Sequence, residues 1–238
     1  MPASHMTGCR LRQLLDANAM TLIASLPENS PDLARAAVEG GADVIKVHIN
    51  VVHHASGTRF GSLEEERERL VAVLEAAGGV PVGIVPRGRP GIDRGDLEPL
   101  IEMGFDFVSA YAAHLSAACL TIRGIGKMVA LDSFYVLEDA AAMACAGVDV
   151  LEASIIPHDG YGGLLTAADV LQYAALARAF GGPVVVPTQR NIRPDDVRAL
   201  MGAGVRGLMI GAVVAGKDPA SFGAATRLYR RVIDEHER

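Results

Sequence analysis

Eight short, almost wholly apolar runs recur along this chain of 238 residues, and a helical pattern follows each of them. Such runs are typical of parallel strands that are buried on both faces of a sheet. Strict alternation of strand and helix predicts a parallel sheet, and eight repeats favour a closed barrel over an open sheet. The predicted strands are Thr21–Leu26, Val44–Ile49, Val82–Val85, Phe105–Ala110, Lys127–Leu131, Val148–Ala153, Val184–Val186 and Gly207–Ile210.

Capping residues and glycines predict where the helices begin and end. Ser30-Pro31 is a cap followed by proline in the first turn, and glycines such as Gly181-Gly182 stop a helix just before the next strand. A short helix over Leu11–Ala17 is expected to cover the bottom of the barrel. The other helices are expected to begin near Ser30, Leu63, Arg94, Ala112, Phe134, Ala167, Pro194 and Pro219.

The length of the chain is common for a single (β/α)8, or TIM, barrel. Because no linker or low-complexity segment interrupts the alternation, we expect residues 1–238 to form one such α/β domain. The opening segment, residues 1–6, resembles a cloning remnant and takes no part in this prediction.

Composition excludes several classes of protein. The formal net charge of −6 argues against nonspecific nucleic-acid binding. No run approaches the roughly 20 apolar residues of a membrane span. Cys9, Cys119 and Cys145 are too few and too scattered for a disulfide framework or a zinc site. Together with the lack of a recognisable signal peptide, these features predict a cytoplasmic protein without a cofactor.

Two charged residues, Lys46 and Glu152, lie inside apolar strands near the carboxyl ends, where barrels of this kind build their sites. A buried charge costs several kcal/mol unless it is paired. One interpretation is a structural ion pair within the barrel. The other is contact with substrate, with Lys46 as acid, base or anion clamp and Glu152 as base.

Other polar residues follow the same strand ends. His48 alternates with Lys46 and so shares its face, either as a proton shuttle or as a hydrogen-bonded structural group. Asp132 either serves the site or caps the helix expected near Phe134. The charged run Glu64–Arg69 is predicted to be a solvated helix face.

Two long loops follow strands 2 and 6. The loop Pro157–Thr166 carries three glycines and His158, and it is either a lid or a plain connector. The loop Val51–Ser62 carries His53-His54, for which solvation and a functional role both stay open.

The stretch Pro183–Gly216 reads as a strand, a turn, a capped helix, a second strand and a Gly-rich turn. In many (β/α)8 barrels the loops after strands 7 and 8 hold a phosphate between them. Arg190 and Asn191 follow strand 7, where a guanidinium could clamp an anion. Gly211 and Ala212 follow strand 8, where a short helix could present its N–H groups.

From about Met20 onward the chain resembles the ribulose-phosphate-binding barrel superfamily, and within it N-acylmannosamine-6-phosphate 2-epimerases most closely. The similar pieces are Ala37–Ala42, Val82–Arg87, Gly147–Asp149 with the loop that follows, and Pro183–Gly216. The resemblance implies a (β/α)8 barrel with a pocket the size of a sugar phosphate.

That family is expected to move a proton beside a carbonyl with a Lys at the end of strand 3 and a Glu at the end of strand 7. This chain has Pro86 at the first position and Pro187 or Thr188 at the second. Lys46 matches the family's strand 2 Arg, a substrate contact, and Arg190-Asn191 replaces its Gly-Gly turn. Any such reaction must therefore use other residues.

Strand 2, Gly41–His48, also resembles the pentulose-phosphate 3-epimerases, which hold a divalent metal with His and Asp. His48 stands where an Asp ligand is expected and strand 7 offers no Asp, so we predict no metal site of that pattern. A looser set of His48, Asp132 and Glu152 is the alternative cation site.

These features predict an isomerase or epimerase that transfers a proton beside a carbonyl in a small, anionic, phosphorylated sugar-like substrate. The alternatives are a Schiff-base aldolase or lyase that uses Lys46, and a non-catalytic anion-binding barrel. By analogy with the superfamily we expect a homodimer. The assigned residues are Glu152 as base, Lys46 as acid or electrostatic stabiliser, His48 and Asp132 to orient substrate, and Arg190, Asn191, Gly211, Ala212, His158 and Arg87 as substrate or phosphate contacts.

Overall fold

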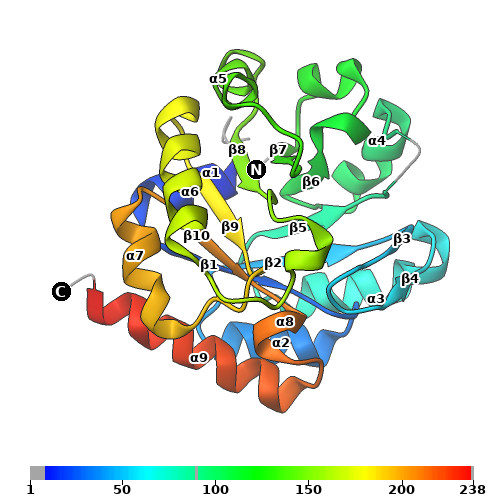
Figure 1. Cartoon of the computed structure of the whole chain (residues 1–238). Helices are drawn as coiled ribbons and strands as arrows, with labels where there is room; N and C mark the ends of the chain where they lie inside the picture. The colour runs from blue at the N-terminus through cyan, green and yellow to red at the C-terminus, as the bar shows by residue number, and fades with distance from the viewer. Residues whose placement is uncertain (1–8, 89–90, 237–238) are drawn as a thin grey trace.

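The computed structural model describes residues 9–88 and 91–236 and contains a closed barrel of eight parallel strands (Figure 1). This confirms the predicted (β/α)8 architecture. The segment interpreted as a cloning remnant lies outside the described residues. Around the barrel the strands are β1 (Thr21–Ser25), β10 (Gly207–Ile210), β9 (Val184–Pro187), β8 (Val150–Ala153), β7 (Gly126–Leu131), β6 (Phe107–Tyr111), β5 (Val82–Val85) and β2 (Val44–His48).

The helices surround this barrel, and α2, α3, α4 and α6 begin at side-chain caps. Ser30 accepts a hydrogen bond from the backbone N–H of Leu33, and Ser62 forms a capping box with Glu65. The helices are α1 (Arg10–Ala17), α2 (Pro31–Glu39), α3 (Leu63–Ala76), α4 (Arg94–Glu102), α5 (Leu137–Cys145), α6 (Ala167–Phe180), α7 (Val197–Gly202), α8 (Ala212–Ala215) and α9 (Pro219–His236). None of the helices in the described ranges has the length and apolar character needed to cross a membrane.

One predicted helix is wrong. The segment expected to form a helix from Ala112 contains two 3-10 helices instead, η1 (Ala112–His114) and η2 (Ala117–Thr121). The backbone between them pairs with Ile92. The Ile92 N–H donates to the carbonyl of His114, and the Ile92 carbonyl accepts the N–H of Ser116. These long-range bonds use backbone groups that an α-helix would need, so tertiary contact overrides helix propensity.

The loop after β2 also differs from its prediction. Instead of a plain loop it contains an antiparallel hairpin of β3 (Val51–Val52) and β4 (Arg59–Phe60). The helix expected near Phe134 begins at Leu137, because Asp132 caps the Phe134 N–H in a turn that precedes it.

The lower half of the barrel is a packed core. Leu11 and Leu15 of α1 close the bottom, as predicted, and pack against inward-facing side chains of the strands. Gly83 on β5 leaves room for Phe107, whose ring atoms would lie 2.1 Å from a Cβ at that position. Above this filled bottom, a cavity opens toward the carboxyl ends of the strands. The strand residues of this core are Ile23, Val44, Phe107, Met128, Val150, Val185 and Met209.

Candidate active site

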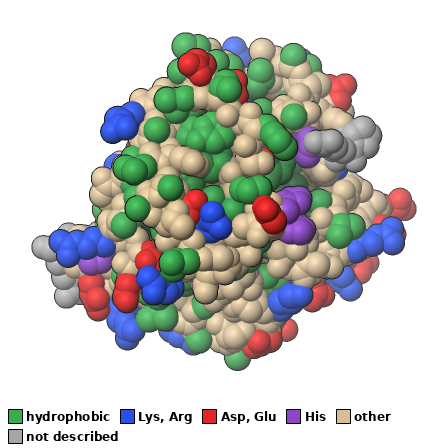
Figure 2. All heavy atoms as spheres, in the orientation of Figure 1, with side chains coloured by type: hydrophobic (Ala, Val, Ile, Leu, Met, Phe, Trp, Pro, Cys, Tyr) green, Lys and Arg blue, Asp and Glu red, His purple; other side chains and the backbone are tan. Residues whose placement is uncertain are grey.

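A cavity of about 260 Å³ opens at the carboxyl ends of the strands. Its polar residues come from β1, β2, β6 and β8 and from the segments after β2, β5, β6, β8 and β9, which is the arrangement expected at this end of a (β/α)8 barrel. Figure 2 shows this molecule in the orientation of Figure 1. The lining residues that carry polar side chains are Ser25, Lys46, His48, His53, His54, Arg87, Ser109, Tyr111, His114, Glu152, Ser154, His158, Tyr161, Thr188 and Gln189.

Lys46 and Glu152 meet across the barrel. β2 and β8 lie four strands apart in either direction, so their side chains enter the lumen from opposite walls. The Lys46 Nζ lies 3.4 Å from Glu152 Oε2, and each residue is only 5% exposed. The ion pair that one interpretation required is therefore present. Because both residues line the cavity, the pair is also in reach of a ligand.

Two serines orient the Glu152 carboxylate. Ser109 donates to Oε2 at 2.7 Å, and Ser154 donates to Oε1 at 2.7 Å. Burial raises the pKa of Glu152, but the Lys46 ammonium and the two serine hydroxyls outweigh it, so the pKa lies below its ordinary value. Glu152 is thus a carboxylate at neutral pH whose charge depends on Lys46.

His48 lies beside this pair as a neutral imidazole. Burial, together with the nearby His53 and Lys46, lowers the pKa of His48 well below its ordinary value. Its Nδ1 is buried and has no hydrogen-bond partner, although the residue lines the cavity. An orphaned buried nitrogen of this kind can bind a hydroxyl or carbonyl group of a ligand.

A second group of residues holds His48 in place. Asn29 donates to the His48 carbonyl at 2.7 Å and accepts from the His48 N–H at 3.3 Å. The same Asn29 amide donates to Glu66 at 3.2 Å, and Glu66 also accepts the N–H of Gly61. Glu66 is buried, so the prediction of a wholly solvated charged face on α3 is wrong at this residue.

The sequence reasoning missed Asn29. It lies four residues after the last residue of β1, and an amide side chain shortly after a strand end was the available signal. The role of Glu66 could not be read from the sequence, because its run of charges is typical of a solvated helix.

Aromatic rings from the two long loops meet over the cavity. His54 stacks on His158 with ring centroids 4.1 Å apart, and Tyr161 lies edge-on to both rings. Gln189 donates to the Tyr161 hydroxyl at 2.6 Å, which ties the loop after β8 to the turn after β9. The loops Val51–Ser62 and Pro157–Thr166 are thereby joined above the Lys46–Glu152 pair.

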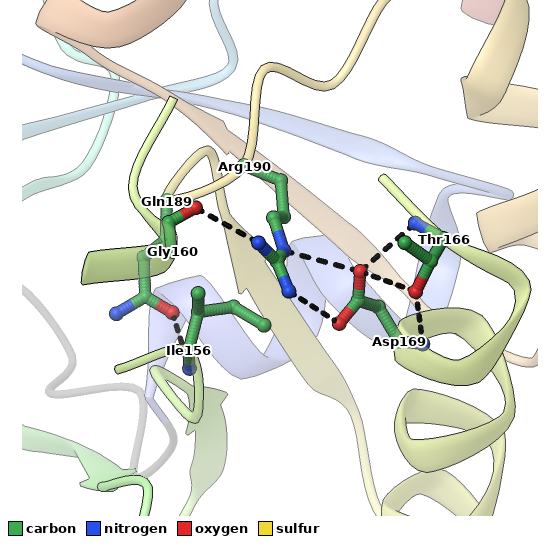
Figure 3. A network of polar contacts seen from close by, with 6 residues as sticks. All are labelled: Ile156, Gly160, Thr166, Asp169, Gln189 and Arg190. Atoms are coloured by element: carbon green, nitrogen blue, oxygen red, sulfur yellow. Dashed lines mark hydrogen bonds and ion pairs between the residues drawn. The ribbon is translucent and has the colours of Figure 1, made fainter. Parts of the chain in front are cut away.

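Arg190 does not line the cavity. Its guanidinium forms an ion pair with Asp169 at the start of α6 and donates to the carbonyl of Gly160 at 2.9 Å (Figure 3). The same carboxylate caps α6 through Thr166. All of these contacts lie within the protein, and they anchor the loop after β8. The Arg190 guanidinium is therefore not placed to bind an anion in the cavity, contrary to the prediction.

The other predicted anion contacts divide between two places. Asn191 is exposed, and its backbone bonds to Gly163, away from the cavity. Gly211 and Ala212 do line the cavity at the start of α8, where the Gly211 N–H donates to Thr188 Oγ1 at 3.1 Å. Of the four residues predicted to hold a phosphate in these two turns, Gly211 and Ala212 line the cavity, and Arg190 and Asn191 do not.

Arg87 lines the rim of the cavity and forms an ion pair with Asp96. Asp132 lies elsewhere: its carboxylate accepts the Phe134 N–H in the turn before α5, not at the helix cap that one interpretation predicted, and it lines a second cavity between η2 and α5. The looser cation set of His48, Asp132 and Glu152 is therefore not brought together. Within the described ranges, no three His, Cys, Asp or Glu side chains are grouped to hold a metal ion.

Comparison with known proteins gives the fold and no more. No protein-family model and no curated protein matches the chain. Among solved structures, thiamine phosphate pyrophosphorylase from Pyrococcus furiosus is similar at 17% identity with a TM-score of 0.64, over 92% of this chain and 97% of that one. Tryptophan synthase from Mycobacterium tuberculosis gives 17% and 0.66, over 95% and 98%. KGPDC from Streptococcus mutans gives 15% and 0.67, over 92% and 99%.

Proposed function

We propose that this protein is an isomerase or epimerase that transfers a proton beside a carbonyl in a small, phosphorylated, sugar-like substrate. The observation that carries the proposal is the meeting of Lys46 and Glu152 within a cavity at the carboxyl ends of the strands. Removing a proton beside a carbonyl needs a base at the carbon and a positive group at the oxygen, and this pair supplies both.

The resting ion pair supports a simple sequence of steps. A substrate carbonyl oxygen takes the place of the Glu152 carboxylate next to the Lys46 ammonium. The ammonium then stabilises negative charge as it develops on that oxygen. The buried carboxylate loses its main opposite charge, so its pKa rises and it becomes a stronger base for the adjacent C–H.

The neighbouring side chains support this assignment. Ser109 and Ser154 hold the two oxygens of Glu152 from different sides, which fixes its orientation after the ion pair opens. The neutral His48 also lines the cavity, where its ring would contact the substrate. The stacked loops above the cavity would exclude water from the intermediate.

For the phosphate we propose the turn Gly211–Ala212. It lines the cavity, and the Gly211 N–H there donates to the Thr188 hydroxyl, which lines the cavity as well. Sites in (β/α)8 barrels lie at this end of the strands. One structure of similar fold is named a thiamine phosphate pyrophosphorylase, which also fits a phosphorylated ligand. A likeness to N-acylmannosamine-6-phosphate 2-epimerases in particular stays a prediction.

Proton exchange tests the proposal without knowledge of the natural substrate. The protein is incubated in D2O with a panel of aldose, ketose and N-acylhexosamine phosphates, and mass spectrometry detects deuterium at the carbon beside the carbonyl. We expect exchange in at least one compound and its loss in Glu152→Gln. Asp106→Asn is the matched control and should keep the activity, because this carboxylate, with its side chain 12% exposed, precedes β6 at the opposite end of the barrel.

The outcomes separate the three functions. Exchange that persists in Glu152→Gln contradicts the assigned base. A covalent adduct at Lys46 after borohydride treatment with substrate indicates a Schiff-base enzyme. Phosphate-ester binding without exchange across the whole panel indicates a non-catalytic binding barrel.

A further inference from the structure

The candidate active site contains a cation that the proposed reaction does not use. Among the described residues that line the cavity, three are Lys, Arg, Asp or Glu, namely Lys46, Arg87 and Glu152. Lys46 and Glu152 balance each other across the barrel. Arg87 therefore adds a positive charge to the wall of the cavity, and a positively charged wall favours an anionic group of a ligand.

The guanidinium of Arg87 is held in place but is not saturated. Its Nη2 forms an ion pair with Asp96 Oδ1, while the other oxygen of Asp96 accepts the backbone N–H of Asp93 at the start of α4. Asp96 is not among the residues that line the cavity, so it orients the guanidinium from outside. The Arg87 Nε is buried and has no hydrogen-bond partner among the described residues. Because a guanidinium carries five N–H donors, it can keep Asp96 and still bind a second anion.

The backbone that carries Arg87 is fixed as well. Asn50, which follows β2, donates its side-chain N–H to the Pro86 carbonyl at 3.1 Å. Asn50 has a positive φ of 53°, a conformation that asparagine adopts more readily than most residues. The turn after β5 is thus tied to the neighbouring strand directly before Arg87. A guanidinium positioned through both its backbone and its side chain loses little freedom when it binds a ligand.

The strand register places Arg87 at a different height from the proposed phosphate site. Gly83 is the register partner of Lys46, and Arg87 lies four residues further toward the rim. By the pairings of β2 with β1 and of β1 with β10, Gly211 lies level with Lys46. Four residues of extended strand rise about 13 Å, so Arg87 and Gly211 contact different parts of a ligand.

The two places also lie on different sides of the barrel. On the shorter way around, β2 and β1 separate β5 from β10 (Figure 1). Lys46 enters the cavity from β2, between Arg87 and Gly211. A ligand that reaches from Gly211 to Arg87 therefore passes the Lys46–Glu152 pair with its middle part.

We propose that Arg87 binds a second anionic group, a carboxylate or a phosphate, at the end of the substrate opposite to the phosphate held at Gly211–Ala212. This inference rests on the proposed function and narrows it to substrates that carry an acidic group at each end. The carbonyl between the two ends then lies at Lys46 and Glu152.

Matched open-chain compounds test the Arg87 site by binding alone. 6-Phosphogluconate and sorbitol 6-phosphate share a six-carbon chain with one phosphate, but the first ends in a carboxylate and the second in an alcohol. In titration calorimetry 6-phosphogluconate should bind at least about tenfold more tightly, the gain expected of hydrogen bonds to a charged group. Sorbitol 1,6-bisphosphate places a second phosphate at the same end. A larger gain with the bisphosphate identifies the anionic group as phosphate, and a larger gain with the acid identifies it as carboxylate.

Arg87→Met should abolish these gains and leave the affinity for sorbitol 6-phosphate unchanged. Arg87→Lys keeps the charge without the planar donors and should retain part of the gain. Arg35→Met is the matched control, because it removes an exposed arginine on α2, and it should keep the full gain. If Arg87→Met does not fold, Arg87→Met combined with Asp96→Asn replaces it, since this variant removes both charges of the ion pair.

Equal binding of the three compounds would overturn the proposal, and so would a gain that persists without Arg87. An equal loss of affinity for sorbitol 6-phosphate and 6-phosphogluconate in Arg87→Met also overturns it, because the single phosphate then lies at Arg87. Failure of the proposed function gives a different result. Sorbitol 6-phosphate then binds no more tightly than sorbitol, while an Arg87-dependent preference for gluconate over sorbitol still reports the second anion site.

Discussion

Replacing Lys46 by Met should destabilise the protein strongly and reverse the pH dependence of its stability. The side chains of Lys46 and Glu152 are 6% and 7% exposed, and the substitution leaves the carboxylate buried without its cation. Breaking a buried ion pair in this way costs about 3–5 kcal/mol. The two serine hydroxyls remain bonded to Glu152, which favours the lower end of that range.

The pH dependence follows from the sign of the pKa shift. In the wild type the pKa of Glu152 is lowered, so its contribution to stability is present above the unfolded value of about 4.3 and is lost only at lower pH. Without Lys46, burial dominates and the pKa rises. The folded variant then binds the extra proton, and its stability should fall by up to about 1.4 kcal/mol per pH unit above pH 4.3.

Urea unfolding followed by circular dichroism between pH 5 and 8 measures both effects. Lys46→Met combined with Glu152→Gln should recover most of the loss, because no uncompensated charge remains buried. Arg35→Met breaks an exposed pair with Asp32 and should cost no more than about 1 kcal/mol. If Lys46→Met loses less than about 1 kcal/mol at pH 8 and keeps the wild-type slope, the account of this ion pair is refuted.

Three further predictions concern the surrounding structure. Burial lowers the pKa of His53 to about 4, so an NMR titration should show a neutral ring down to about pH 4; a midpoint near 6.5 would contradict it. Gly83→Ala places a Cβ against the Phe107 ring and should lower the free energy of unfolding in urea by about 1–3 kcal/mol. Gly95→Ala, where a Cβ meets open space, should not lower it. Asp169→Asn weakens the guanidinium contacts that anchor the loop after β8, and thermal melting should show a loss of about 2 kcal/mol; an unchanged midpoint would refute that role.

The barrel could be predicted because its signal is repeated and local. Val44–His48 and Val184–Pro187 are buried throughout, as expected of parallel strands covered on both faces. The cap at Ser30 and the helix that closes the barrel bottom were likewise visible in short windows. The segment after β6 was not, because its conformation depends on hydrogen bonds to Ile92, which is distant in sequence.

The candidate site was predicted only in part. Lys46 and Glu152 stood out because a charge inside an apolar strand needs a partner or a ligand. Arg190 was as prominent, yet its partner Asp169 lies on another element, and no sequence window joins them. The phosphate prediction therefore keeps only the turn after β10.

The sequence by itself determined the eightfold alternation and the two buried charges. Each of these features is contained in one short segment: the apolar run of a buried strand, and a charged residue within such a run. Only the tertiary structure decided which polar groups meet. Closing the barrel sets β2 opposite β8 and so brings Lys46 to Glu152. The same closure brings the Arg190 guanidinium into contact with Asp169 and leaves a cavity beside Tyr111. Those distances depend on the register and closure of the whole sheet, which no single segment encodes.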